Sequence, residues 1–163
     1  LAIAQGGTGA ATLAAAGITA TPAFFINKSA NQAINDVTNT IVTFDTEIFD
    51  TNSAFASNTF TVPAGEAGKY WISYQVVFSD SAAVMSETNT QIHLNDVVQS
   101  NTYASDSNGQ HRFTSHNPSF LFDLSVADEL KVNSYVNTTD GGTADVAGGS
   151  NYNTWFQGFK LIG

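Results

Sequence analysis

The sequence contains no cysteine and few charged residues, and both features narrow what the protein can be. Without thiols it has neither a disulfide framework nor a thiolate zinc site, so packing within or between chains must hold the fold. Only 12% of the 163 residues are charged, and five Lys and Arg face fourteen Asp and Glu, for a net charge of −9. Scattered bases on an acidic chain argue against binding to nucleic acid and against adhesion to anionic membranes.

Membrane-spanning and catalytic signatures are also missing. No apolar run approaches the roughly 20 residues of a membrane helix, so we predict no membrane insertion. No Gly-x-Ser-x-Gly elbow is present, and the adjacent carboxylates of Asp128 and Glu129 would point to opposite faces of a strand, which does not suit glycoside hydrolysis. We therefore predict a protein that is not an enzyme and needs no cofactor.

Two short acidic segments leave calcium as an alternative. Residues 106–108 and 140–145 carry the hard oxygen ligands that calcium prefers, but they lack the regular spacing and bidentate Glu of an EF-hand loop. His111 and His116 share a polar segment with Asp106, at a spacing that indicates a solvated loop more than a metal site. Turns are the favoured interpretation of these segments.

The clearest structural signal lies between Ser57 and Asp80. Apolar residues alternate with polar ones in a long stretch, which predicts a strand with one face in a core. A shorter alternation comes before it and ends at a proline, and the connector between the two is rich in glycine. The alternating residues are Phe60 and Val62, then Tyr70, Ile72, Tyr74, Val76 and Phe78.

The rest of residues 23–163 shows the same pattern in short segments. We predict a hairpin turn at Asn95-Asp96 and long loops over residues 101–118 and 138–153. Further strands are predicted over residues 23–26, 41–45 (with 48–49), 90–94, 97–98, 120–126, 130–136 and 153–162. Eight to ten antiparallel strands without an amphipathic helix predict an all-β jelly-roll sandwich.

Residues 1–22 differ from the rest because they contain neither a charged nor an aromatic residue. We therefore predict two parts, a shaft-like or linker segment over 1–22 and a jelly-roll tip domain over 23–163. If the first part is a shaft, its small residues allow close approach of neighbouring chains, with Ile3, Leu13 and Ile18 facing them. Its sequence AQGGTGAATLAAAGI resembles a segment of bacteriophage tail fibres that precedes a C-terminal tip domain. This resemblance implies an extracellular protein of the virion.

A second resemblance covers most of the remaining chain. The order of its motifs is similar to that of the globular head of complement component 1q and its tumour-necrosis-factor-like relatives, which implies a homotrimeric jelly roll. The matching segments are Ala23-Phe24, residues 41–45, residues 60–63 with 68–70, residues 124–130 and residues 156–161. The chain departs from the family pattern at Asn58 and Ala127, where glycines are usual, and in a turn lengthened by residues 66–68.

These observations predict host-surface recognition by the trimeric tip of a phage tail fibre, with a bacterial surface polysaccharide or outer-membrane protein as partner. The alternatives are a structural trimerisation cap and a secreted component-1q-like binding protein. The aromatic excess, and apolar residues opposite the core rows, predict the trimer interface. Its candidate residues are Tyr70, Trp71, Tyr74, Leu121, Trp155 and Phe156. The candidate receptor-binding residues, from the longest polar segment, are Tyr103, Asp106, Asn108, His111 and Arg112.

Overall fold

The computed structural model describes residues 22–82, 84–106, 111–149 and 153–161, and their regular structure is β-strand throughout. The expectations for the shaft segment, including those for Ile3, Leu13 and Ile18, lie outside these residues. No helix in the described ranges is long and apolar enough to cross a membrane. The strands are β1 (Ala23–Asn27), β2 (Gln32–Asn35), β3 (Thr40–Ile41), β4 (Thr46–Asp50), β5 (Phe55–Ala56), β6 (Thr59–Thr61), β7 (Gly68–Ser79), β8 (Met85–Leu94), β9 (Val97–Ser105), β10 (Phe113–His116), β11 (Ser119–Leu124), β12 (Glu129–Thr138), β13 (Thr143–Val146) and β14 (Trp155–Lys160).

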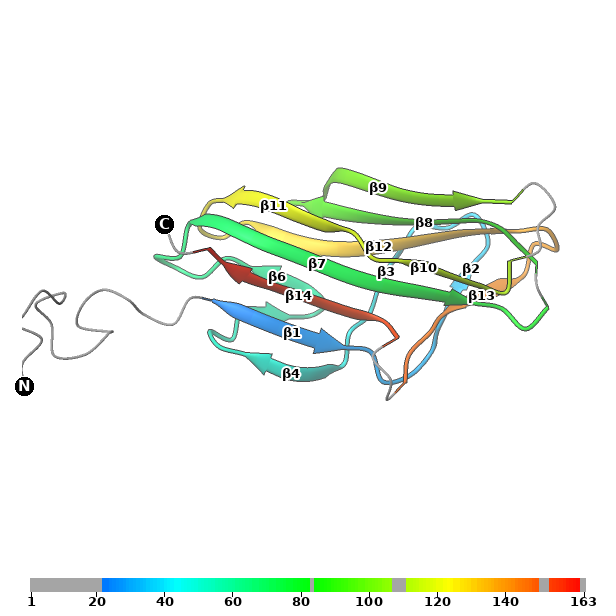
Figure 1. The fold of residues 1–163 in the computed structure, drawn as a ribbon, viewed down its shortest axis with the longest axis horizontal. Coiled ribbons are helices and arrows are strands. Elements are labelled where there is room, and N and C mark those ends of the chain that lie inside the picture. Colours follow the sequence, from blue (N-terminus) through cyan, green and yellow to red (C-terminus); the bar gives the residue numbers. More distant parts are fainter. Residues whose placement is uncertain (1–21, 83, 107–110, 150–152, 162–163) are drawn as a thin grey trace, which may run out of the picture.

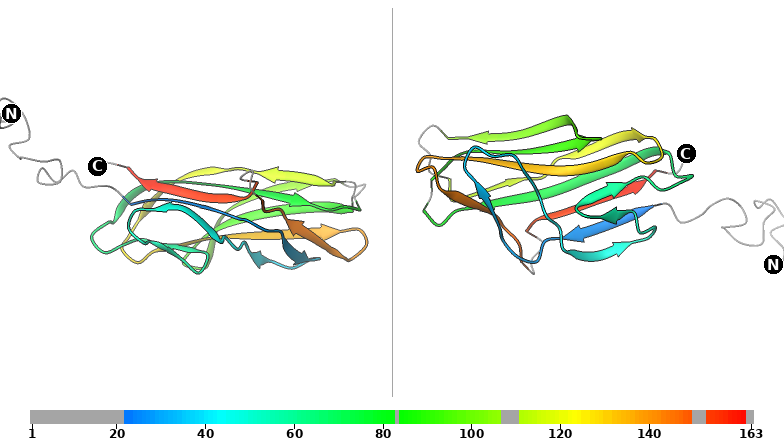
Figure 2. Two further views of the ribbon diagram at one scale, coloured as in Figure 1. Left: turned by 90° about the horizontal axis from the view of Figure 1, so that it is seen from below. Right: turned by 180° about the vertical axis from the view of Figure 1, so that it is seen from behind.

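The strands form two antiparallel sheets that pack face to face (Figures 1 and 2). In the first sheet β7 pairs with β10 and β11 along one edge and with β13 and β14 along the other, followed outward by β2 and β1 and then β4. The second sheet has the order β5, β6, β12, β8, β9, with β3 also on β12. Some strands lie end to end in one row: β10 with β11, β13 with β14, β2 with β1, and β3 with β6. Counted in this way, each sheet has five rows of strands. The predicted jelly roll is confirmed.

The long strand β7 supplies the centre of the core. Its alternate residues are fully buried between the sheets, which the period-two pattern predicted. They meet Phe24 and Phe156 of the first sheet, and Phe60, Ile92 and Val132 of the second. Phe24 stacks on Phe60 at 4.6 Å between ring centroids, so aromatic contacts join the two layers.

Four polar side chains of the core form two hydrogen-bonded pairs between the sheets. Tyr74 donates its hydroxyl hydrogen to Thr90 Oγ1 at 3.1 Å, and His116 Nε2 lies 2.9 Å from Thr88 Oγ1. Thr88, Thr90 and Tyr74 are all fully buried. Because burial of an unpaired hydroxyl is costly, these pairs fix which residues of the two sheets face each other.

The described part of residues 101–118, predicted to be a loop, is mostly strand, and that prediction is wrong. β9 continues to Ser105, and β10 covers Phe113–His116. β9 is an edge strand whose inward positions are Ser100, Thr102 and Ala104, so it has no apolar row to reveal it. β10 and β11 keep one register along β7 and are separated only around Pro118, which has no N–H for the ladder.

Two other segments also differ from prediction. Residues 138–153 contain the short strand β13, whose buried residues Ala144 and Val146 are too few to show a pattern. The strand expected over 41–45 ends at Ile41. Val42 and Phe44 are still buried. The backbone N–H groups of Thr43 and Phe44, however, bond to side chains: Gln32 Oε1 accepts from the Thr43 N–H at 2.9 Å, and Asn58 Oδ1 accepts from the Phe44 N–H at 2.8 Å.

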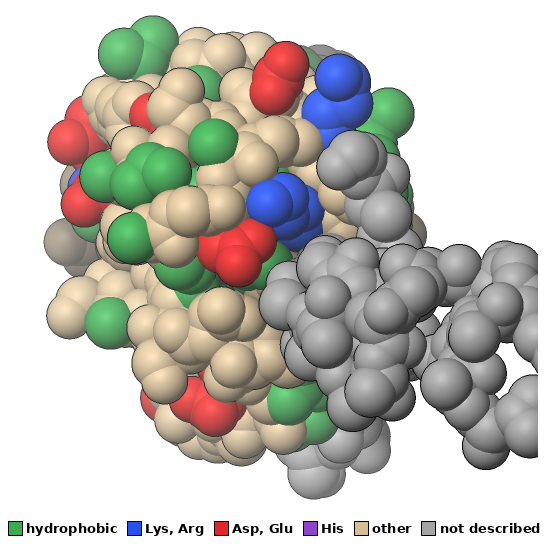
Figure 3. Space-filling model, turned by 90° about the vertical axis from the view of Figure 1, so that its left-hand side faces the viewer, with side chains coloured by type: hydrophobic (Ala, Val, Ile, Leu, Met, Phe, Trp, Pro, Cys, Tyr) green, Lys and Arg blue, Asp and Glu red, His purple; other side chains and the backbone are tan. Residues whose placement is uncertain are grey.

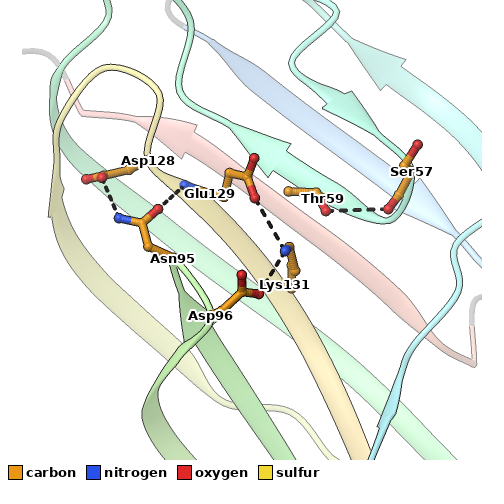
Figure 4. Close-up of polar contacts among 7 residues, drawn as sticks. All are labelled: Ser57, Thr59, Asn95, Asp96, Asp128, Glu129 and Lys131. Carbon is orange, nitrogen blue, oxygen red and sulfur yellow. Dashed lines mark hydrogen bonds and ion pairs between the residues drawn. The ribbon is translucent and has the colours of Figure 1, made fainter.

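The hairpin turn at Asn95-Asp96 is confirmed, and both residues have the positive φ of a type I′ turn (51° and 65°). It is bonded to the turn before β12 (Figure 4). Asn95 Nδ2 donates to Asp128 Oδ1 at 2.8 Å and Asn95 Oδ1 accepts from the Glu129 N–H at 2.9 Å. Lys131 Nζ lies 2.8 Å from Asp96 Oδ1 and 3.3 Å from Glu129 Oε2. The two turns therefore hold each other in place.

The sandwich has two ends that differ in what they carry. The end with Ala23, Gly68 and Lys160, here called the proximal end, is where the described chain begins and the last strand finishes (Figure 1). The opposite end, at Ser79 of β7, is called the distal end. Figure 3 shows the proximal end as largely uncharged polar surface with scattered charged and apolar side chains. At about 3.3 Å per residue, the 12 residues of β7 separate the two ends by roughly 35 Å.

Candidate functional site

The outer face of the first sheet carries a row of large apolar side chains. Strand alternation turns most of these residues away from the core, because their neighbours in sequence point inward. Leu121, Trp71 and Phe159 are register partners on β11, β7 and β14, and Leu121 is 72% exposed. The outer aromatic face, as we call it, consists of Phe25, Phe49, Trp71, Leu121, Trp155 and Phe159.

The rings of this face contact one another across the strands. Trp71 and Phe159 have ring centroids 5.3 Å apart, and Phe25 lies 6.3 Å from Phe49 and 6.1 Å from Trp155. Phe49 and Phe159 remain nearly half exposed. Large apolar side chains gathered on one face of a sheet are typical of a protein interaction site.

Half of the predicted trimer-interface residues lie elsewhere. Tyr70, Tyr74 and Phe156 are fully buried in the core of the single chain, so their prediction as interface residues is wrong. They belong to the inward rows of β7 and β14. Trp71, Leu121 and Trp155 do lie on the outer aromatic face. The prediction missed Phe25, Phe49 and Phe159, although Phe25 and Phe159 could have been found, because each follows the alternation of its strand outward.

A polar pocket opens at the distal end, where β7, β10 and β13 meet. Its volume is about 300 Å³, and it is lined by Asn31, Ser79, Asp80, Ser81, Arg112, Phe113 and Asp145. Phe113 and Asp145 both pair with Ser79, from opposite sides of β7, and this register brings two distant segments together. The two segments predicted to be long loops, residues 101–118 and 138–153, therefore both contribute to one pocket.

Hydrogen bonds hold two carboxylates of this pocket in place. Asp145 Oδ2 accepts from Asn31 Nδ2 at 3.0 Å, and Asn31 Oδ1 accepts from the Gly148 N–H at 3.0 Å. Asp80 Oδ1 accepts from the Ala82 N–H, and the Asp80 N–H donates to the Arg112 carbonyl at 2.9 Å. The Arg112 guanidinium makes no ion pair with a described residue, and the Phe113 ring is 69% exposed. A charged donor, carboxylate acceptors and an open aromatic ring can together bind a polar ligand.

The predicted receptor-binding residues do not form one cluster. Arg112 lines the distal pocket, whereas Tyr103 projects from the outer face of β9 and does not line it. Asp106 follows β9, where its N–H donates to the Ser86 carbonyl at 2.8 Å. His111 bridges to Met85 through the backbone, with its Nε2 buried and unpaired among the described atoms. Asn108 lies outside the described residues. Asn31 and Asp80 were missed, because only the fold brings them to Arg112, and Phe113 was missed because its segment was predicted to be a loop.

The other carboxylates considered for hydrolysis or calcium binding make hydrogen bonds and ion pairs in or next to turns. Asp128 accepts from Asn95 and, through Oδ2, from the Ser125 N–H at 2.8 Å, while Glu129 contacts Lys131. Asp140 Oδ1 accepts from the Gly142 N–H at 2.9 Å. In the described part of the chain, no three His, Cys, Asp or Glu residues lie together as a metal site would require. The calcium alternative stays a prediction, because part of residues 106–110 is outside that description.

Comparison with known proteins identifies the fold. The globular domain of zebrafish complement 1qA protein matches with a TM-score of 0.60 at 13% sequence identity, over 86% of this chain and 98% of that one. Murine APRIL matches with TM-scores of 0.63 (pH 8.0) and 0.62 (pH 5.0) at 14% identity, over 86% of this chain and 99% of that one. The chain has the component-1q and tumour-necrosis-factor-like jelly-roll fold.

The comparisons extend no further than that fold. No protein-family model matches the sequence, and no curated protein matches it. The fold likeness covers 86% of the chain. It agrees with the fold that the second sequence resemblance implied.

Proposed function

We propose that the protein is a homotrimeric binding module that forms the tip of a bacteriophage tail fibre and attaches it to a host-surface structure. The observation that carries this proposal is the position of the distal pocket. It lies at the opposite end of the sandwich from Ala23, where residues 1–22 join the domain. If residues 1–22 continue into a shaft, the pocket faces away from the shaft and toward a target.

Self-association is supported by the outer aromatic face. Six large apolar side chains stand on one face of a sheet and would be covered by neighbouring copies. The motifs shared with the component-1q-like family imply a trimer. Placing the aromatic faces around a common axis buries them and leaves the distal pockets of three chains pointing the same way.

The virion setting is supported by the residues before β1. The sequence Gly6-Gly7-Thr8-Gly9-Ala10 resembles tail-fibre shaft segments, and it precedes the jelly roll as such a shaft would. The resulting location is extracellular, at the fibre tip. The partner class is a bacterial surface polysaccharide or an outer-membrane protein.

Recognition by this protein needs no bond to be made or broken. A trimer presents each pocket three times, so weak binding at one site is strengthened by effective concentration when the target repeats across a cell surface. The side chains available are the Arg112 guanidinium, the exposed Phe113 ring and the carboxylates of Asp80 and Asp145. Exposed residues on a rigid scaffold are where binding typically concentrates.

The test compares attachment to bacterial cells by fluorescently labelled protein variants. Arg112→Ala combined with Phe113→Ala removes a cation and an exposed ring at the distal end. Lys69→Ala combined with Val126→Ala is the matched control, because it removes an exposed cation and an exposed apolar side chain near the proximal end. We expect the first pair to keep the oligomeric state and to lose most cell attachment, and the control to attach like the parent.

Two other results would point away from this proposal. Equal attachment by both pairs would move recognition away from the pocket. A parent trimer that attaches to none of a broad panel of bacterial strains would favour the alternative of a structural cap, which the outer aromatic face alone would support.

A further inference from the structure

The outer face of the second sheet carries an ordered array of polar side chains, nearly all of them uncharged. The three long strands β9, β8 and β12 are neighbours, and their registers align the outward residues in rungs. One rung consists of Tyr103, Asn89 and Tyr135. The rungs on either side are Asn101, Gln91 and Asn133, and Ser105, Glu87 and Asn137.

This array, here called the amide–tyrosine face, contrasts with the outer face of the first sheet. There six outward residues are Trp, Phe or Leu, whereas here seven of the nine are Asn, Gln or Tyr. Only Glu87 carries a charge among the nine. Each amide offers both donors and an acceptor, so the face can bond to hydroxyl groups of either polarity.

The two tyrosines stand on either side of β8. Strands lie about 4.8 Å apart in a sheet, so Tyr103 and Tyr135 are separated by about 10 Å across Asn89. Tyr103 is 58% exposed on the edge strand β9, and Tyr135 is half-buried. Aromatic rings of this kind provide apolar surface that packs against the C–H face of a sugar, while their hydroxyls remain available for bonding.

Asn89 between them has an unpaired acceptor. Its Oδ1 is buried and accepts no hydrogen bond from a described residue. A buried polar atom without a partner costs free energy, which is recovered when a donor reaches it. A hydroxyl that enters between the two tyrosines would be such a donor.

We infer that the amide–tyrosine face is a binding site for a neutral polysaccharide chain lying across β9, β8 and β12. An uncharged, hydroxyl-rich polymer matches the amides and tyrosines. A polyanion would be repelled by the net charge of −9 on the chain. The only charged residue among the nine array residues is Glu87, which is also acidic. The site is separate from the distal pocket, and it does not depend on the tail-fibre assignment. In a trimer joined through the outer aromatic face it stays open to solvent.

The experiment is affinity electrophoresis of the full chain through native gels that contain dextran, mannan or mixed-linkage β-glucan, with alginate as the acidic comparison. We expect at least one neutral polymer to retard the protein and alginate to leave it unretarded. Tyr103→Ala should weaken the retarding interaction by about fivefold to tenfold, the effect of losing one aromatic contact. Tyr103→Trp should preserve it, because the ring surface is kept.

Arg112→Ala is the matched control, because it alters the distal pocket and leaves this face intact. It should bind the polymer like the parent, and thermal unfolding should show that every variant folds. The inference is overturned if no neutral polymer retards the parent, if only alginate does, or if Tyr103→Ala is retarded as strongly as the parent. Loss of binding in Arg112→Ala alone would assign the polymer to the distal pocket and would also overturn it.

Discussion

Trp71 and Phe159 face each other across β7 and β14, with ring centroids 5.3 Å apart on the surface turned away from the core. Leu121 continues the row on the other side of Trp71. The inward residues of the same strands, Ile72 and Gly158, are register partners beneath them. One alternating pattern thus builds the core and the outer aromatic face together.

The first prediction concerns this row. Leu121→Lys places a charge in the proposed interface, once in each copy, where burying it is costly. We expect the variant to sediment as a monomer while the parent sediments as a trimer. Val98→Lys, an equally simple change of an exposed apolar residue on β9, should leave the trimer intact. A parent protein that is monomeric at micromolar concentration contradicts the proposed assembly.

The core leaves no room for a side chain at Gly158 of β14. A Cβ at this position would lie 2.5 Å from Ile72 Cδ1, 3.0 Å from Phe24 Cε1 and 3.1 Å from the Trp71 carbonyl oxygen. We expect Gly158→Ala to lower the free energy of unfolding by about 2–3 kcal/mol, because the close-packed core must shift to admit it. Urea unfolding measures this. A loss below about 0.5 kcal/mol would show that the core adjusts freely.

At Ala127 we predict the opposite effect, a gain in stability on substitution. This residue has a φ of 68°, in the left-handed region where a Cβ is unfavourable. The turn is fixed by hydrogen bonds of its neighbours, including the Asp128 N–H to the Ser125 carbonyl at 3.1 Å. Ala127→Gly should therefore raise the free energy of unfolding by about 1 kcal/mol, measured by the same urea method. A stability equal to or below that of the parent would contradict this account of the turn.

The departures from the family pattern can now be explained in the same terms. Asn58, which stands where a glycine is usual, has a φ of 65° and is therefore in a conformation that asparagine tolerates better than most residues. Its side chain also accepts the Phe44 N–H. Sequence comparison could mark the position but not the second role, which depends on a segment 14 residues away.

The sequence predicted best where burial alternates strongly. β7 and β12 have an apolar or buried residue at every second position, and both were found. The strand β9 was predicted only at its first two residues, because an edge strand with small inward residues shows no apolar period. Periodicity also could not show whether Tyr70 and Tyr74 lie in the core or in an interface, because the apolar row of a strand can face either the other sheet or another chain.

The candidate sites were harder to predict because they are built across the chain. Arg112 and Asp145 come together only because β10 and β13 both pair with the end of β7, and Phe113 lies in a segment that was predicted to be a loop. Tyr103 and Tyr135 lie in one rung only because both are register partners of Asn89 on β8, the strand between them. Residue types indicated binding chemistry, but long-range register decided which residues act together.

The last prediction concerns pH. His116 is buried against Phe78, with ring centroids 5.6 Å apart, and contacts Thr88 through Nε2. Burial lowers the pKa of His116 below its usual value near 6.5, because the charged ring loses its water. The folded state therefore holds His116 neutral at a pH where the unfolded state already binds a proton. Its contribution to stability is complete above about pH 6.5 and declines as the pH falls below that value.

We expect the free energy of unfolding of the parent to fall between pH 7.5 and pH 5.5, and that of His116→Gln to fall less. Glutamine cannot titrate and can still bond to Thr88. Urea unfolding at the two pH values gives the difference for each protein, so any uniform loss from the substitution cancels. A smaller decline should persist in the variant, because burial also lowers the pKa of His93, partly offset by Asp96. Equal declines in parent and variant would show that His116 is not the buried histidine that responds to pH.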